Sequence, residues 1–195
     1  MNVGLYFGSF NPIHNGHLII ANHLAQEGNL QEVWFVLSPQ NPFKKNNSLL
    51  NENHRFFLLQ EAIEGEVKLK SSKVEFTLPR PSYTIDTLTY LAEKYPGHTF
   101  HIIMGSDSFQ NLAKWKNGEL IARTYPLIIY KREGFEIKND INASITIADA
   151  PLLNISSTRI RDMIRKGKSI RYLVPESVKE EIENKNYYRD LKHPA

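Results

Sequence analysis

Hydrophobic and polar positions along the chain alternate between short apolar runs and longer segments in which apolar residues recur every three or four positions. The first pattern is typical of buried strands and the second of amphipathic helices. The predicted strands are 3–7, 33–37, 67–69, 74–76, 100–104, 127–130 and 145–147. The predicted helices are 17–26, 51–63, 82–95, a stretch through Phe109 and Leu112, 156–165 and 175–184.

The order of these elements predicts the fold class. A strand, a helix and a second strand follow one another at the start of the chain, which indicates a right-handed βαβ unit with parallel strands. The alternation continues without a repeat or a long linker, so we expect one doubly wound α/β domain over residues 1–195 with a helical C-terminal end. Ligands of such folds bind beyond the carboxyl ends of the strands. Chemistry is therefore expected in segments 8–17, 38–45, 105–116 and 154–161.

Three helix starts carry residues that suit them. Ser82 is placed to cap the helix that ends before Pro96, and Ser156 or Ser157 is placed to cap the helix near the C-terminus. Pro175 suits the first turn of the last helix, where its missing N–H group costs nothing.

Composition and charge narrow the classes of protein. The chain has no cysteine, which excludes disulfides, thiolate metal sites and a cysteine nucleophile. The net charge of +3 favours anionic ligands, but no Lys/Arg run indicates a nucleic-acid-binding tail. The first ten residues lack the pattern of a signal peptide, and no apolar stretch is long enough to cross a membrane. We therefore expect a cytoplasmic enzyme or binding domain.

The segment after the first predicted strand, Gly8–His17 (GSFNPIHNGH), carries the strongest chemical pattern. A glycine at this point lets a ligand approach the backbone closely. His14 and His17 are three residues apart at a helix start, so both rings can share one face. A helix N-terminus presents free N–H groups to a phosphate, and imidazoles add further donors. This arrangement suits the charge stabilisation that phosphoryl or nucleotidyl transfer needs.

Other interpretations of this segment remain. A turn with two surface or capping histidines would have the same spacing. A zinc pair is also conceivable, but no third ligand follows at a recognisable distance. The segment lacks the Gly-Lys-Ser/Thr ending of a Walker A loop and the glycine pattern of a dinucleotide-binding fingerprint.

A second phosphate-binding candidate is Ile155–Arg161 (ISSTRIR). Arg159 lies in the first turn of the predicted helix, where its charge opposes the helix dipole unless it serves an anion. Capping hydroxyls, free amides and a guanidinium together predict a triphosphate clamp. The alternative is an ordinary helix cap with exposed arginines.

The two motifs, GSFNPIHNGH and ISSTRIR, together resemble the paired signatures of the nucleotidyltransferase superfamily, whose first motif is GxFxPxHxGH. More narrowly, the chain resembles bacterial nicotinate mononucleotide adenylyltransferases. Segments 41–44 (NPFK), 81–86 (PSYTID) and 105–115 (GSDSFQNLAKW) carry this narrower resemblance, which extends over essentially the whole chain in the expected order. The last two of these segments separate the chain from pantetheine-phosphate adenylyltransferases and cytidylyltransferases. The resemblance implies a Rossmann-like nucleotidyltransferase fold.

The resemblance also implies roles for single residues. His14 and His17 would contact the ATP phosphates and the transition state. The groove shared by both substrates would be lined by Gly8, Ser9 and Phe10, and Lys44 would reach the phosphates. Thr84, beside Tyr83, would hold the nicotinate carboxylate, and Trp115 would stack on the pyridine ring. The adenosine would be bordered by Gly105 and Asp107, and the triphosphate bound by Ser156, Ser157 and Arg159. Without the resemblance, Thr84, Asp107 and Trp115 would each be assigned to structure.

The implied reaction joins nicotinate mononucleotide to the AMP part of ATP and releases pyrophosphate, with Mg²⁺ held by the triphosphate and water rather than by a named protein ligand. The partners expected are these small molecules and no nucleic acid or membrane, and the chain could form a homo-oligomer. The nearest alternative acceptors are nicotinamide mononucleotide and phosphopantetheine. A non-catalytic nucleotide- or RNA-binding domain and a Rossmann oxidoreductase are more distant alternatives.

Two positions depart from the family pattern. Asn11 stands where an aspartate is usual, so a hydrogen-bonding side chain is kept and its charge is lost. Ser9 stands where many members have glycine or threonine.

Overall fold

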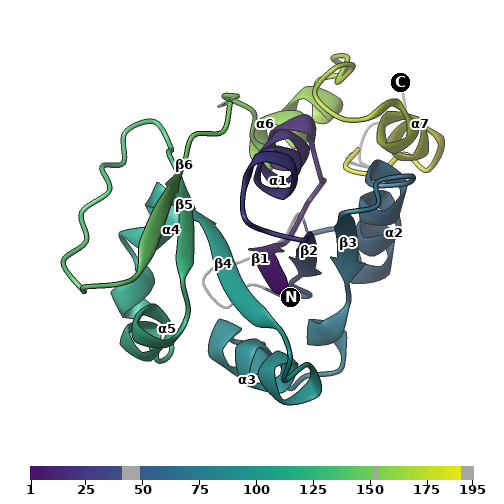
Figure 1. Ribbon diagram of the computed structural model, residues 1–195. Coiled ribbons are helices and arrows are strands. Elements are labelled where there is room, and N and C mark those ends of the chain that lie inside the picture. The colour runs from purple at the N-terminus through teal and green to yellow at the C-terminus, as the bar shows by residue number, and fades with distance from the viewer. Residues whose placement is uncertain (41–48, 152, 190–195) are drawn as a thin grey trace.

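Six parallel strands form one sheet in the order β3-β2-β1-β4-β5-β6 (Figure 1). The structure is a computed structural model that describes residues 1–40, 49–151 and 153–189. The strands are β1 Asn2–Gly8, β2 Glu32–Leu37, β3 Leu69–Ser72, β4 Thr99–Gly105, β5 Leu127–Tyr130 and β6 Ile145–Ala148. All five neighbouring pairs run parallel. The strand order reverses between β1 and β4, which places the switch point of a doubly wound fold beside Gly8 and Gly105.

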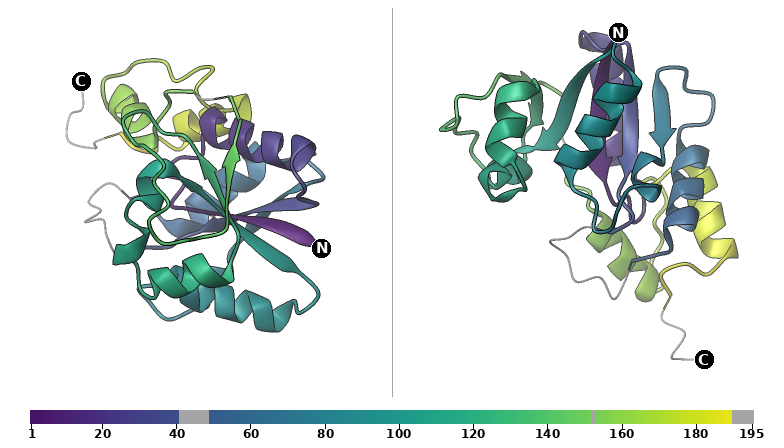
Figure 2. Two further views of the ribbon diagram at one scale, coloured as in Figure 1. Left: turned by 60° about the vertical axis from the view of Figure 1, so that its left-hand side comes forward. Right: turned by 90° about the horizontal axis from the view of Figure 1, so that it is seen from below.

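Helices cover both faces of the twisted sheet (Figures 1 and 2). The α-helices are α1 Asn15–Glu27, α2 Glu52–Ala62, α3 Thr84–Lys94, α4 Ser106–Phe109, α5 Gly118–Thr124, α6 Ser157–Arg165 and α7 Glu176–Asn184, and the 3-10 helices are η1 Val74–Phe76 and η2 Leu112–Lys114. One face lies under α1, α2, α6 and α7, and the other lies over α3 and α5. The predicted doubly wound α/β class with a helical C-terminal end is confirmed. None of the helices in the described ranges is long and apolar enough to cross a membrane.

The core consists of two clusters, one on each face of the sheet. Along β1, Leu5 belongs to the cluster under α3 and α5, and its neighbour Tyr6 belongs to the cluster under α1. In β4, Ile102 and Ile103 divide in the same way. This period of two is that of a strand, and burial on both faces explains why these strands are continuous apolar runs in the sequence.

The prediction of a strand at 74–76 is wrong, because Val74–Phe76 forms the 3-10 helix η1. Glu75 in its middle is only 2 % exposed. Its carboxylate accepts hydrogen bonds from the Ser82 hydroxyl at 2.6 Å and the Thr87 hydroxyl at 3.0 Å. The 3-10 turn directs the Glu75 carboxylate inward, to Ser82 and Thr87, which are seven and twelve residues further along the chain. We attribute the helical conformation of 74–76 to these contacts.

The predicted cap at Ser82 is also wrong. Helix α3 begins at Thr84 with Tyr83 in the N-cap position, and Ser82 donates its hydroxyl to Glu75 instead. By contrast, Ser156 caps α6 as predicted, accepting from the backbone N–H of Arg159 at 3.2 Å. Pro175 is the residue directly before α7.

Two further elements have boundaries that differ from the predictions, and one helix was missed. Helix α1 begins at Asn15 rather than near 17, and β3 is Leu69–Ser72 rather than 67–69. Val67 is 79 % exposed, so its apolar side chain does not mark a buried strand position. Helix α5 was not predicted, because its seven residues are too few for a clear apolar period.

Candidate active site

The two histidines of the first motif lie together where β1 ends and α1 begins. His14 is the N-cap residue of α1, and His17 lies within its first turn. The two imidazole rings stack with a centroid distance of 3.6 Å and an interplanar angle of 21°. The expectation that both rings share one face is therefore confirmed.

Both histidines are neutral at pH 7 in this structure. Burial, and to a smaller extent the charge of Arg132, lowers the pKa of His14 to about 4. The pKa of His17 is lowered well below its usual value by burial, then by His14 and Arg132. The Nδ1 atom of each ring is buried and has no hydrogen-bond partner among the described residues. Two neutral imidazoles can therefore donate to an anion, whose negative charge would in turn raise their pKa.

A cavity of about 440 Å³, here called the central cavity, opens beside these rings. The carboxyl ends of β1 and β5, the short helix α4 that follows β4, and the starts of α1 and α6 form its walls. Its lining residues are Tyr6, Phe7, Gly8, Ser9, Phe10, Asn11, His14, His17, Leu49, Asp107, Ser108, Tyr130, Arg132, Ser156, Ser157, Thr158 and Arg161. The structure thus brings together the first motif (8–17), the start of segment 105–115 and the last motif (155–161).

The positive charge of the central cavity comes partly from Arg132, which the sequence analysis did not single out. Arg132 follows β5, and its Nε atom lies 3.7 Å from Oδ1 of Asp107. Its Nη2 atom donates to the Tyr130 hydroxyl at 3.2 Å. The only available signal was its position just after a predicted strand, in a segment without a recognisable motif.

The start of α6 packs directly on the first motif. The Ser157 hydroxyl donates to the Pro12 carbonyl at 2.9 Å, and Arg161 Nη1 donates to the Asn11 carbonyl at 2.8 Å. Arg161 lines the central cavity, whereas the side chain of Arg159 is exposed on another side of the helix. Two residues span about 200° of rotation on an α-helix, which explains why only one of these arginines can face the cavity.

A smaller cavity of about 140 Å³ adjoins the central one at Gly8 and Ser9. It is lined by Phe7, Gly8, Ser9, Ser38, Glu75, Ser82, Tyr83, Thr84, Ser108, Trp115 and Lys116. This small cavity contains all three of the ring-binding candidates, Tyr83, Thr84 and Trp115. It also contains Lys116, whose Nζ atom lies 2.9 Å from Oδ2 of Asp86 and 4.6 Å from the centroid of the Tyr83 ring.

A third cavity, also of about 440 Å³, lies on the other side of the histidines and is called the side cavity here. It is lined by Tyr6, His14, Gly16, His17, Ile20, Tyr130, Lys131, Arg132, Glu133, Leu153, Asn154, Ile155 and Ser156. The three cavities thus form a row, in which Gly8 and Ser9 separate the first pair and His14 and His17 the second.

Two glycines at strand ends are closely packed by neighbouring side chains. A Cβ atom on Gly8 would lie 2.8 Å from the Phe10 ring, and one on Gly105 would collide with Asp107 Oδ1. Gly105 is buried at the end of β4 and supports Asp107 and Arg132 from behind. Lys44, the remaining predicted phosphate contact, lies outside the described residues.

The two departures from the family pattern have different surroundings. Asn11 is 5 % exposed, and its side-chain Oδ1 accepts the backbone N–H of Leu50 at 3.2 Å. It therefore holds the segment before α2, a contact that needs an acceptor but no charge. Ser9 lines both the central and the small cavity.

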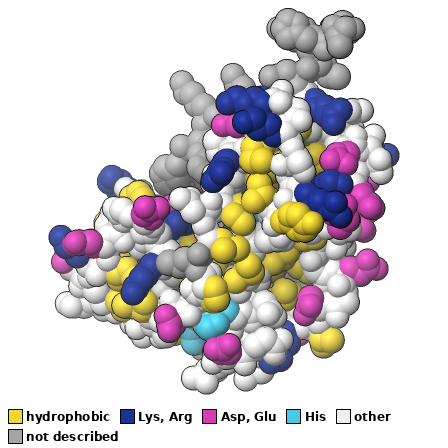
Figure 3. Space-filling model, turned by 90° about the horizontal axis from the view of Figure 1, so that it is seen from above, with side chains coloured by type: hydrophobic (Ala, Val, Ile, Leu, Met, Phe, Trp, Pro, Cys, Tyr) yellow, Lys and Arg dark blue, Asp and Glu magenta, His cyan; other side chains and the backbone are white. Residues whose placement is uncertain are grey.

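On the face seen from above, basic and acidic side chains are interspersed around a band of hydrophobic ones (Figure 3). A protein surface that reads nucleic acid gathers Lys and Arg on one face or along one groove. This face does not have that distribution, which argues against the RNA-binding alternative there.

Comparison with known proteins agrees with the motifs. A family model described as cytidylyltransferase-like matches residues 5–163. A protein of Cytophaga hutchinsonii named probable nicotinate-nucleotide adenylyltransferase is 49 % identical over 191 residues, which cover 96 % of this chain and 98 % of that protein. A protein of Flavobacterium johnsoniae with the same name is 45 % identical and is covered over its whole length, with 97 % of this chain.

The fold is shared with a solved structure. Plasmodium falciparum nicotinic acid mononucleotide adenylyltransferase, complexed with NaAD, aligns with a TM-score of 0.82 over 96 % of this chain and 97 % of its own, at 24 % identity. Taken with the family model and the relatives of more than 40 % identity, this places the chain in a defined group. The chain belongs to the cytidylyltransferase-like family and, within it, to the nicotinate-nucleotide adenylyltransferases.

Proposed function

We propose that the protein transfers the adenylyl group of ATP to the 5′-phosphate of nicotinate mononucleotide, giving nicotinate adenine dinucleotide and pyrophosphate. The observation that carries this proposal is the row of three cavities, with paired histidines and arginines in the middle and an aromatic pocket at one end. A dinucleotide product has the same order: base, phosphates, base. The relatives' names support the same activity.

ATP fits the side cavity and the central cavity together. The base would lie in the side cavity, where Ile20, Leu153 and Ile155 supply apolar contacts. The triphosphate would lie in the central cavity near Arg132 and Arg161, with the capped start of α6 beside it. The N-terminus of α6, a helix of nine residues, and the two guanidinium groups suit a polyanion.

The nicotinate ring of the acceptor would lie in the small cavity, with its phosphate directed towards the central cavity. Trp115 offers a flat face to the cationic pyridinium ring, and Tyr83 adds a second aromatic wall. Thr84 and Lys116 supply a hydroxyl and a positive charge for the ring carboxylate. A site that donates to a carboxylate disfavours a carboxamide, which has one acceptor oxygen fewer.

The proposed chemistry is an in-line displacement. A phosphate oxygen of the acceptor attacks the α-phosphorus of ATP, the bond from that phosphorus to the bridging oxygen breaks, and pyrophosphate leaves with the electron pair. The acceptor phosphate is already ionised at neutral pH, so no general base is needed. The neutral His14 and His17 rings would donate hydrogen bonds to the transferring phosphate, and Arg132 would stabilise the developing charge.

Mg²⁺ would enter with ATP and neutralise the triphosphate. In the described part of the chain, no three histidine, cysteine or carboxylate side chains form a metal-binding cluster, and Asp107 is the only carboxylate that lines the central cavity. This donor set fits an ion held mainly by phosphate oxygens and water. The cytoplasmic location and the homo-oligomer expected from the sequence remain predictions.

The test is pyrophosphate release from ATP and Mg²⁺ with either nicotinate or nicotinamide mononucleotide. Release mainly with the nicotinate form supports the proposal. Release mainly with the nicotinamide form keeps the chemistry but overturns the acceptor. No release with either, together with ATP binding, would favour phosphopantetheine as acceptor or the non-catalytic alternative.

A further inference from the structure

Arg55 on helix α2 is the largest fully buried side chain in the described part of the protein, with no exposed surface. Burial lowers the pKa of its guanidinium to about 10, so it remains charged at neutral pH. A buried charge needs partners, since an isolated ion is costly to remove from water. No ion pair of Arg55 occurs among the residues that the structure describes, so its partners are of another kind.

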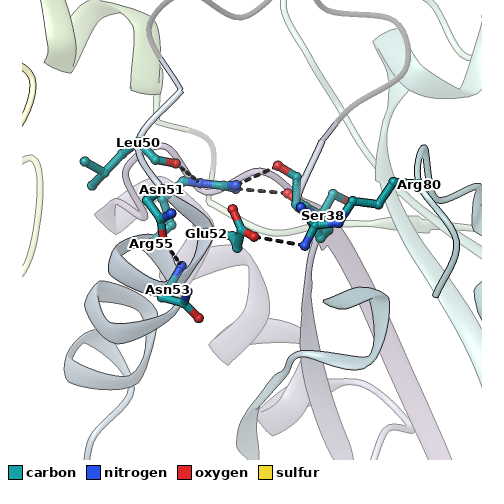
Figure 4. Close-up of polar contacts among 8 residues, drawn as sticks. Ser38, Leu50, Asn51, Glu52, Asn53, Arg55 and Arg80 are labelled. Atoms are coloured by element: carbon teal, nitrogen blue, oxygen red, sulfur yellow. Dashed lines mark hydrogen bonds and ion pairs between the residues drawn. The ribbon is translucent and has the colours of Figure 1, made fainter. Parts of the chain in front are cut away.

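Within the described residues, the hydrogen-bond partners of Arg55 are four backbone carbonyls, and Figure 4 shows its guanidinium between Leu50 and Ser38. Its Nη1 atom donates to Ser9 at 2.6 Å and to Ser38 at 2.9 Å. Its Nη2 atom donates to Pro39 at 2.8 Å, and its Nε atom donates to Leu50 at 2.7 Å. These distances are those of strong charge-assisted hydrogen bonds.

The positions of these carbonyls are as informative as their number. Ser9 directly follows β1, and Ser38 directly follows β2, the strand with which β1 pairs. Both residues line the small cavity, and Ser9 also lines the central one. Arg55 lines neither of them. It therefore lies behind the backbone that both substrates would meet.

Holding the Ser9 carbonyl determines what the loop presents in front. A trans peptide group directs its N–H opposite to its C=O, so the Phe10 N–H points away from Arg55. Phe10 adopts a φ of 42°, a left-handed conformation that a residue with a side chain rarely takes without help from its surroundings. Four carbonyl dipoles converging on one point also repel each other, and only a cation with a branched set of donors compensates all of them.

We propose that Arg55 is a positioning residue for adenylyl transfer, which fixes the backbone of the loops after β1 and β2 before either substrate binds. This inference rests on the proposed function and adds to it a residue that would touch neither substrate. A residue whose role was only to stabilise the fold would influence unfolding and leave turnover and Michaelis constants unchanged well below the melting temperature.

The first test compares Arg55→Lys with Arg80→Lys. Lysine keeps the charge but offers three donors at one point, so it cannot reach four separate carbonyls. Arg80 is a control from the same region, because it pairs with Glu52 on the exposed start of α2 at 2.9 Å. In folded Arg55→Lys protein at 25 °C, kcat/KM for both ATP and nicotinate mononucleotide should fall by about 10- to 100-fold, as expected for a misplaced reacting group. Arg80→Lys should stay within about two-fold of the wild type.

The outcomes separate the two proposals. If the wild-type protein releases no pyrophosphate with any acceptor, the proposed function fails, whatever Arg55 does. If the wild type is active and folded Arg55→Lys has kinetic constants like those of Arg80→Lys, the positioning role fails and the proposed function stands.

A second test needs no variant, and so it also covers the case in which Arg55→Lys does not fold. Amide hydrogen exchange is measured on the wild-type protein over segments 5–13 and 33–40, without ligand and with saturating ATP and Mg²⁺. A backbone fixed in advance should already be protected without ligand, to within about three-fold of the liganded protein. Exchange at the rate of an unfolded chain until ligand is added would overturn the inference.

Discussion

The charge state of the histidine pair depends on the surroundings of each residue. His14 and His17 stack at 3.6 Å, and burial keeps both rings uncharged. Two positive charges this close would repel each other, so in the proposed mechanism both rings are neutral donors before a phosphate binds. The stack also contacts aromatic neighbours, since the His17 ring lies 5.2 Å from that of Phe10. The side of the central cavity where charge would develop during transfer is therefore lined by closely packed rings.

Replacing His17 by alanine tests its part in the reaction. His17→Ala should lower kcat by about 10²–10³-fold, the usual cost of removing one donor to a transition-state oxygen. Turnover is measured by pyrophosphate release, and circular dichroism checks the fold. His23→Ala on the same helix is the control, because His23 lies outside the cavities described above. Turnover of His17→Ala near that of the control would remove His17 from the mechanism.

Trp115 allows a test at the other end of the row of cavities. Trp115→Ala should raise KM for nicotinate mononucleotide by about ten-fold or more, since stacking of an aromatic ring on a cationic ligand contributes on the order of 1–2 kcal/mol. KM for ATP should change little, because Trp115 lines only the small cavity. For Trp115→Phe, which keeps a flat aromatic face, KM for nicotinate mononucleotide should lie between the values of the wild type and Trp115→Ala. Equal rises in both Michaelis constants would assign Trp115 to structure.

How far the sequence predicts such a site depends on whether a residue belongs to a local motif. The histidines and the serines at the start of α6 stand in segments with recognisable spacing. Arg132 and Arg55 do not, since each acts through contacts with residues that are distant in the sequence. Arg159 and Arg161 show a further limit. Both lie in the same motif, and only the rotation of α6 determines which of them faces the cavity.

At the scale of elements, every strand except β3 was predicted to within one residue at each end, and β5, which is buried at all four positions, was predicted with its observed bounds. The segment 74–76 failed because Val-Glu-Phe has the alternation of a strand. Its polar middle residue is stabilised by hydroxyls of the chain leading into α3 and of α3 itself. Such a long-range polar contact leaves no periodic trace in the sequence.

The buried carboxyl of Glu75 joins η1 to α3, and its loss should act on both stability and the acceptor site. Glu75→Gln removes one of two acceptor oxygens, so the free energy of unfolding should fall by about 1 kcal/mol. Because Ser82 and Glu75 both line the small cavity, KM for nicotinate mononucleotide should rise while KM for ATP stays constant. Urea unfolding and steady-state kinetics measure the two effects. Glu93→Gln, at an exposed position of α3, is the control and should change neither.

At the scale of the whole molecule, the topology explains why distant segments form one site. The reversal of strand order between β1 and β4 places their carboxyl ends side by side, and the start of α6 packs against the same edge. This arrangement buries groups that titrate, which destabilises their charged forms. For the histidine pair, this effect is measurable as a dependence of the free energy of unfolding on pH.

The direction in which the free energy of unfolding changes with pH follows from how many protons each state binds. In the unfolded chain His14 has a pKa of about 6.5, and in the folded chain its pKa is lowered to about 4. Between these values the unfolded chain binds more protons, so the free energy of unfolding must fall as the pH decreases from 6.5 towards 4. From pH 7 to pH 5 the contribution of His14 alone should be on the order of 1–2 kcal/mol, and His17 adds a change of the same sign.

The measurement is urea unfolding of the wild type and of His14→Gln at pH 7 and pH 5. Carboxylates titrate alike in both proteins, so the difference between their pH dependences reports His14 together with its effect on the pKa of His17. The wild type should lose more stability than the variant on acidification. Saturating ATP and Mg²⁺ should reduce that excess loss, because bound phosphates raise the pKa of the imidazoles and let the folded protein take up protons as well. Equal losses in the two proteins without ligand would mean that folding does not lower the pKa of His14, and the lowered pKa described for this ring would then be wrong.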